Sequence, residues 1–129
     1  YKLCHGDLTL SNIIIDYSKK KLILIDFLKT YNENIIQDYA KLYQEFKLGW
    51  SGRHLGSIKN TRSSIIYENI INNNQWNELD IRLKKAIIIE TYMTLFRILP
   101  YLNPSDENTL KWILTSFKQL NKSIKSNNL

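Results

Sequence analysis

Two short segments near the start of the sequence carry the side chains best suited to chemistry. Residues 5–12 place a carboxylate at Asp7 and an amide at Asn12 on one short stretch, and residues 24–27 carry a second carboxylate, Asp26. Phosphoryl transfer needs a carboxylate that orients the attacking hydroxyl and accepts its proton, together with oxygen ligands for divalent cations. We therefore interpret Asp7 as a catalytic base and Asn12 and Asp26 as metal ligands.

A β-hairpin is the element that would bring these side chains together. Residues 13–15 and 21–25 are β-branched or apolar runs typical of strands, and residues 16–20 between them are turn-forming. The first strand starts at the loop that ends in Asn12, and the second strand ends at Asp26. All the candidate side chains are therefore expected at the same end of the hairpin.

The motifs of this region resemble those of a known family. His5-Gly6-Asp7-Leu8, with Asn12 four positions later, is similar to the H-G-D-L-x-x-x-N loop of the aminoglycoside phosphotransferase and choline kinase family. Ile25-Asp26-Phe27 is similar to the I-D-F or I-D-W run that follows in that family. Its members are relatives of the protein kinases, whose catalytic loop has the same separation of Asp and Asn.

The resemblance implies a role for each residue of the site. Asp7 is implied to be the catalytic base, and Asn12 and Asp26 are implied to bind the Mg²⁺ that accompanies ATP. His5 is implied to brace the catalytic loop. Thr9 departs from the pattern, because protein kinases carry a lysine there and relatives in this family often carry a histidine. The motif therefore leaves open which group contacts the transferred phosphate.

Asp38 is a further candidate, in a predicted helix that follows the hairpin. The run Asp38-Tyr39-Ala40-Lys41-Leu42 is similar to the D-L-A-K-L run found after the metal-binding Asp in the family. That likeness implies a carboxylate that accepts hydrogen bonds and fixes the catalytic loop. The alternative is a plain first-turn acid, which the helix dipole favours.

The elements predict an α+β fold, and the family resemblance implies that it corresponds to the carboxy-terminal lobe of protein kinases. A small β-hairpin carries the catalytic loop, and about four helices follow it. Periodic apolar positions predict helices over 35–48, 62–72, 78–102 and 104–125, the last with Asn103 as its N-cap. We expect the third of these helices to be central to the core, because its apolar residues cover most of its circumference.

The chain of 129 residues is short for a complete kinase of this family, and it contains no glycine-rich run and no Val-Ala-Ile-Lys-like strand. We interpret residues 1–129 as the carboxy-terminal lobe of a small-molecule kinase whose amino-terminal nucleotide-binding lobe is absent. This chain alone is then expected to be inactive. Apolar area and a strand edge exposed around residues 1–27 are expected to favour self-association.

Two other classes of function stay open on the sequence. The chain could be a non-catalytic, truncated kinase-like lobe that acts as a binding or structural module. It could also be a metal-dependent phosphoester hydrolase, because His-x-Asp also serves as a metal motif. Such sites usually draw on several histidines, and this chain has only His5 and His54, each of which has an ordinary structural reading.

The composition of the chain limits the binding partners and the cellular compartment that we expect. The net charge is +6, but the lysines are spread along the chain without a basic stripe, so nucleic acid is not an expected partner. Cys4 is the single cysteine, which suits a reducing cytoplasm, and no apolar run of membrane-spanning length is present. The expected partners are ATP, Mg²⁺ and a small hydroxylated acceptor.

The acceptor pocket is the least specified part of the sequence. Residues 50–57 are expected to form a loop, in which Trp50, Arg53 and His54 are candidates for lining that pocket; the alternative is a solvated connection. The region after Gly49 lacks the acidic clustering that would suit an aminoglycoside and an obvious aromatic cage for choline. A sugar or polyol is therefore the default expectation.

Overall fold

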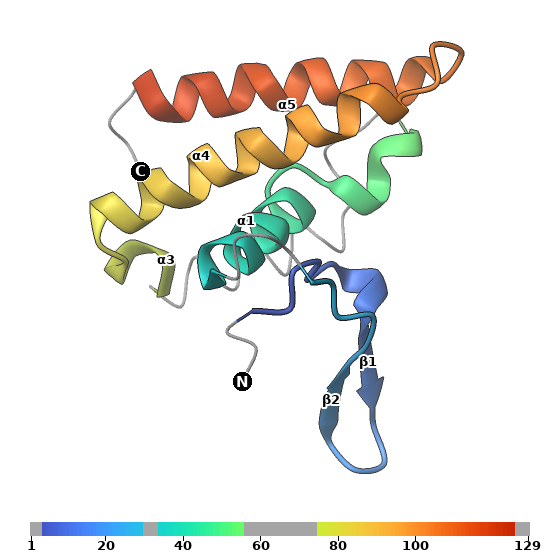
Figure 1. The fold of residues 1–129 in the computed structure, drawn as a ribbon, viewed down its shortest axis with the longest axis vertical. Helices are drawn as coiled ribbons and strands as arrows, with labels where there is room; N and C mark the ends of the chain where they lie inside the picture. Colours follow the sequence, from blue (N-terminus) through green and yellow to red (C-terminus); the bar gives the residue numbers. More distant parts are fainter. Residues whose placement is uncertain (1–3, 30–33, 56–74, 126–129) are drawn as a thin grey trace.

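The computed structural model describes residues 4–29, 34–55 and 75–125 of the chain (Figure 1). Within these ranges a two-stranded antiparallel hairpin is followed by four α-helices, which confirms the predicted α+β class. The strands are β1 (Ile13–Asp16) and β2 (Lys21–Leu24), and the α-helices are α1 (Ile35–Phe46), α3 (Gln75–Glu78), α4 (Ile81–Ile98) and α5 (Glu107–Lys125). Short 3₁₀ helices cover Leu10–Asn12, Trp50–Leu55 and Leu99–Tyr101.

The hairpin projects away from the helices (Figure 1). Its register pairs Ile13 with Leu24 at the base and Asp16 with Lys21 at the turn. The Asp16 carboxylate accepts hydrogen bonds from the Ser18 hydroxyl and the Lys19 amide, at 2.7 and 3.1 Å, and so closes the turn. Most apolar side chains of the two strands are exposed to solvent: Ile14, Ile15, Leu22, Ile23 and Leu24.

The helices form a separate body in which α4 lies between α1 and α5 (Figure 1). Its core is apolar and fully or almost fully buried, with contributions from α4, α5 and the end of the α1 segment: Leu48, Ile87, Ile88, Leu95, Trp112, Ile113 and Leu120. The indole Nε1 of Trp112 donates to the carbonyl of Leu48, so α5 is also tied to the end of α1 by a buried hydrogen bond. Within the described ranges, no helix is both long and apolar enough to cross a bilayer.

Helix α1 has a capped start and a glycine shortly after its end. The Asn34 side chain accepts from the Ile36 amide at 3.0 Å, and the chain turns at Gly49 with a φ of 68°, a left-handed value that favours glycine. The helix ends at Phe46, two residues before the predicted end. Its buried face is strongly polar, with Gln37, Asp38, Gln44 and Glu45 buried beside Ala40 and Tyr43. An apolar stripe alone therefore does not describe how α1 packs.

The third predicted helix is shorter and less buried than the sequence indicated. The predicted start at residue 78 was wrong, because the Asp80 side chain caps α4 by accepting from the Arg82 amide at 2.6 Å, and Glu78 belongs to α3. It changes to a 3₁₀ turn after Ile98, where Pro100 has no N–H to donate. Although α4 packs against α1 and α5, an apolar stripe on it is half or more exposed: Ile89, Met93 and Phe96.

Two other predictions also differ from the structure, namely the start of the last helix and the loop over 50–57. Helix α5 begins at Glu107, not at residue 104, because Asp106 is the effective cap and accepts from both the amide and the hydroxyl of Thr109. Asn103 instead closes the preceding turn by accepting from the Ser105 amide. The expected loop over 50–57 contains the 3₁₀ helix Trp50–Leu55, and the predicted helix over 62–72 lies outside the described residues.

Candidate active site

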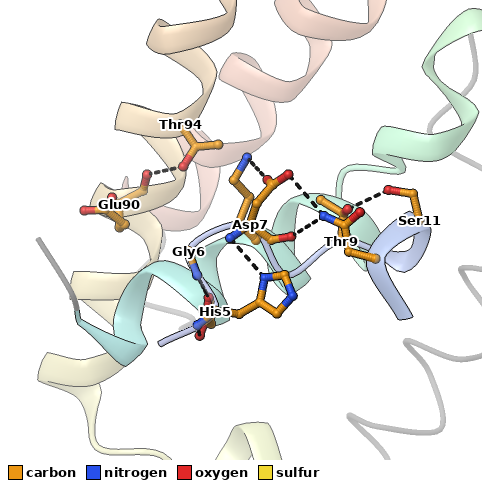
Figure 2. A network of polar contacts seen from close by, with 10 residues as sticks. His5, Gly6, Asp7, Thr9, Ser11, Glu90 and Thr94 are labelled. Atoms are coloured by element: carbon orange, nitrogen blue, oxygen red, sulfur yellow. Dashed lines mark hydrogen bonds and ion pairs between the residues drawn. The ribbon is translucent and has the colours of Figure 1, made fainter. Parts of the chain in front are cut away.

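The loop that holds Asp7 is fixed by hydrogen bonds to a buried carboxylate of α1. Asp38 accepts a hydrogen bond from the His5 amide at 2.6 Å and another from the Gly6 amide at 2.9 Å (Figure 2). Gly6 has a φ of 87°, which a side chain would disfavour. Because Asp38 is 8% exposed, it holds these two amides where water does not compete freely. The contact defines the shape of the loop.

His5 connects the same loop to the segment that leaves β2. Its Nε2 lies 2.7 Å from the Ile25 carbonyl, and its Nδ1 lies 3.3 Å from the Asp7 amide nitrogen. The tautomer consistent with both contacts carries the proton on Nε2 and accepts at Nδ1. The ring also packs against Phe27 with centroids 4.3 Å apart, and His5 is 3% exposed. His5 is therefore a buried contact between the loop at residues 5–12 and the segment at residues 25–27.

Each carboxylate oxygen of Asp7 has a neighbouring donor. Asn12 Nδ2 donates to the Asp7 carbonyl at 2.8 Å and lies 3.3 Å from Asp7 Oδ2. Asp7 Oδ1 lies 2.8 Å from the Nζ of Lys41 on α1. The Asp7 side chain is 30% exposed, so it remains reachable for a substrate.

The hairpin register places Asn12 opposite Ile25, the residue before Asp26. The Ile25 amide donates to the Asn12 carbonyl at 3.1 Å, which extends the ladder by one pair beyond Ile13 and Leu24. Asp26 follows directly and has a φ of 57°. That left-handed value is uncommon for a residue with a side chain and is typical of functional positions.

Asn12 and Asp26 have the chemistry that Mg²⁺ requires. Because Asn12 uses its Nδ2 to hold Asp7, its amide oxygen is the atom left for another ligand. The exposed carboxylate of Asp26 is a second hard oxygen donor. Mg²⁺ is usually bound by one or two protein oxygens together with substrate phosphates. Among the residues that the structure describes, no three His, Cys, Asp or Glu side chains are grouped to hold a metal by themselves.

Trp50, Arg53 and His54 make contacts within their own segment and with α5 and its cap. The Arg53 guanidinium lies 3.7 Å from the centroid of the Trp50 ring and donates to the Trp50 carbonyl. Burial lowers the pKa of Arg53, against the opposing effect of nearby carboxylates. His54 Nδ1 lies 3.5 Å from Asp106 Oδ2. These contacts favour the reading of this segment as an anchored connection.

Lys41 is the residue of this group that sequence reasoning did not assign. A signal existed, because Lys41 follows Asp38 by three positions, and residues at that spacing share one face of a helix. One turn of α1 thus holds the loop backbone through Asp38 and the Asp7 carboxylate through Lys41. Glu90 of α4 lines a cavity of about 260 Å³ together with Asn34 and Gln37. Figure 2 shows its carbonyl accepting from the Thr94 hydroxyl.

A scan of the chain against protein-family models gives no match, and neither do searches of curated proteins and of solved structures. The family resemblance therefore depends on the two motifs, on the D-x-A-K-L run and on the geometry that links them.

Proposed function

We propose that this chain carries the catalytic loop and metal ligands of an ATP-dependent kinase that phosphorylates a hydroxyl group of a small molecule. The enzyme would be of the aminoglycoside phosphotransferase and choline kinase type. The observation that carries the proposal is the double clamp on Asp7 and its loop. Asp38 binds two successive loop amides, while Asn12 binds the Asp7 carbonyl and carboxylate. A plain turn before a strand has no need of such a clamp.

Each residue has a defined task in this reaction. Asp7 orients the acceptor hydroxyl and accepts its proton as the oxygen attacks the γ-phosphorus of ATP. The new O–P bond forms as the bond from phosphorus to the β,γ-bridging oxygen breaks, and ADP leaves with that electron pair. Asn12 and Asp26 would hold Mg²⁺, which neutralises phosphate oxygens when bound. His5 and Asp38 keep the loop in register with both ligands.

The acceptor class is a sugar or polyol, in accordance with the absence of acidic clustering and of an aromatic cage in the sequence after Gly49. An aminoglycoside or a choline-like alcohol is the alternative within the same reaction. Neither changes the role of Asp7, because every one of these acceptors presents a hydroxyl group.

Substitution in the complete enzyme tests the assignment. We expect Asp7→Ala and Asp26→Ala each to lower kcat by about a hundredfold or more, since each removes a group that acts on the reacting atoms. Asp26→Asn is a matched variant, because asparagine tolerates a positive φ and leaves the backbone undisturbed. Asp16→Ala, at the opposite end of the same hairpin, is the control.

Turnover is measured with ATP and Mg²⁺ against a panel of sugars, polyols, aminoglycosides and choline, and folding is checked by circular dichroism. Near-wild-type turnover in folded Asp7→Ala or Asp26→Ala would exclude the proposed roles. We expect residues 1–129 alone to transfer no phosphate, as a non-catalytic lobe would behave, because the sequence has no glycine-rich phosphate-covering run. The complete enzyme is therefore the informative sample.

A further inference from the structure

Lys41 presents a cation directly beside the proposed base. Its Nζ lies 2.8 Å from Asp7 Oδ1, and its side chain is only 18% exposed (Figure 2). The aliphatic stem is thus largely buried along α1, and the ammonium is held at the loop. An ammonium carries three N–H donors, and one carboxylate oxygen occupies one of them. Lys41 therefore has donors left for a second anion.

A transferred phosphoryl group would lie within reach of that ammonium. The acceptor hydroxyl must lie about 2.6–3.2 Å from Asp7 for proton transfer. Its oxygen must also lie about 3–3.5 Å from the phosphorus in a reactive arrangement. Since Lys41 Nζ touches the same carboxylate, a small rotation of its flexible stem brings it to an equatorial phosphoryl oxygen.

The loop itself offers no cation for this position. Thr9 is 6% exposed, and its hydroxyl is 2.8 Å from the hydroxyl of Ser11 (Figure 2). Asp7, Asp26 and Asp38 all bring negative charge to the site, which an incoming phosphate would increase.

We propose that Lys41 is the phosphate-binding cation of this site, which contacts the transferred phosphoryl group from α1. This inference rests on the proposed kinase function and names the group that neither motif supplies. Its ligand class is a phosphoryl oxygen of a nucleotide or of a free polyphosphate.

The test measures phosphate binding without requiring turnover. Magnesium pyrophosphate is titrated into isotopically labelled chain 1–129, and the amide resonances of Gly6 and Asp7 report binding at the loop. The Lys41 variants are Lys41→Met, Lys41→Gln, which retains a neutral donor toward Asp7, and Lys41→Arg, which retains the cation. Asp26→Asn is titrated in the same series to test the proposed metal ligand separately. Lys85→Met removes an exposed lysine of α4 and is the control for nonspecific attraction to a basic chain.

We expect saturable shifts of the Gly6 and Asp7 resonances in the wild type. In Lys41→Met and Lys41→Gln, the affinity for magnesium pyrophosphate should be lower by about tenfold or more. Lys41→Arg should stay within about threefold of the wild type, and Lys85→Met should be unchanged. Lys41→Gln also covers the case in which Lys41→Met does not fold, as judged from its amide spectrum.

Each other result has a separate meaning. Wild-type affinity for magnesium pyrophosphate in a folded Lys41→Met or Lys41→Gln variant overturns the role of Lys41. If Asp26→Asn binds more weakly in the same series, the assignment of Asp26 as a metal ligand stands. Loss in the Lys41 variants with no change in Asp26→Asn supports Lys41 and removes Asp26 from the metal site. The absence of shifts at Gly6 and Asp7 in the wild type overturns the role of Lys41, while the kinase assignment is judged by the turnover of Asp7→Ala.

Discussion

Asp38 is the residue on which the shape of the loop around Asp7 depends. Its carboxylate satisfies the amides of His5 and Gly6, both of which are buried. Without that acceptor, two buried N–H groups would lose their partner at once. A buried donor without a partner is costly, more so where its partner was charged.

We predict that Asp38→Ala lowers the free energy of unfolding by about 3 kcal/mol, given about 1.5–3 kcal/mol for each hydrogen bond to a charged group and partial relaxation of the loop. Asp38→Asn should cost less, because one acceptor oxygen remains. Urea denaturation followed by circular dichroism measures both, with Asp16→Ala as the control. A loss below about 1 kcal/mol in Asp38→Ala would mean that the loop keeps its shape by other contacts.

The sequence allowed single candidate residues to be named, but not the contacts that they make. Asp7, Asn12 and Asp26 could be singled out because short motifs and the hairpin pattern operate over a few residues. The ion pair between Asp7 and Lys41 could not, because it depends on where α1 crosses the loop. For the same reason the sequence could not show that Arg53 stacks on Trp50.

At the scale of single elements, the start of α5 depends on a titrating cap. Hydrogen bonds from the hydroxyl and then the amide of Thr109 lower the pKa of Asp106 from its usual value of 3.8, with smaller help from His54. A carboxyl group with a lowered pKa in the folded state stabilises the fold above its unfolded pKa. It loses that contribution as the pH falls through the lower, folded value.

We therefore predict that the first turn of α5 frays as the pH falls below about 3.8. The protection factor of the Thr109 amide, measured by NMR hydrogen exchange across this range, should decrease. In Asp106→Asn the amide oxygen still caps the helix but has no proton to gain, so this acid response should disappear. An identical response in Asp106→Asn would assign the effect to another group.

Helix boundaries show where local signals compete. Asn103 and Pro104 form a proper helix-start signal, yet Asp106 satisfies the amide and hydroxyl of Thr109 and takes over as the cap. The apolar residues over most of the circumference of α4 predicted a central place in the core, but the neighbours α1 and α5 cover only part of its surface. Periodicity identifies which residues can be buried, and packing partners decide which of them are.

At the scale of the whole molecule, the hairpin and the helices are distinct parts. The strands carry exposed apolar residues and, within the described residues, pair only with each other (Figure 1). Exposed apolar area with unpaired strand edges favours association between copies. The exposure was expected from the family resemblance, which implies a further lobe against these strands, whereas the outward direction of the hairpin required the structure.

We predict that residues 1–129 form a dimer or a larger assembly through the region around residues 1–27. Analytical ultracentrifugation over a range of concentrations measures the assembly. Ile14→Lys and Leu22→Lys should each shift the chain toward monomer, because a charge on an apolar strand surface opposes association. Ile89→Lys, which alters an exposed apolar residue of α4, is the matched control and should leave the assembly unchanged. A clean monomer at high concentration in the wild type would contradict the prediction.

The pairing of Ile25 with Asn12 also limits how the length of this gene segment can change during evolution. One residue gained or lost inside either strand would turn every later side chain to the opposite face and carry Asp26 away from Asn12. The turn at residues 17–20 lies at the far end of the ribbon, where added residues leave the base pairing untouched. Homologous genes should therefore tolerate insertions and deletions at this turn and exclude them from the rest of the segment between Asn12 and Asp26.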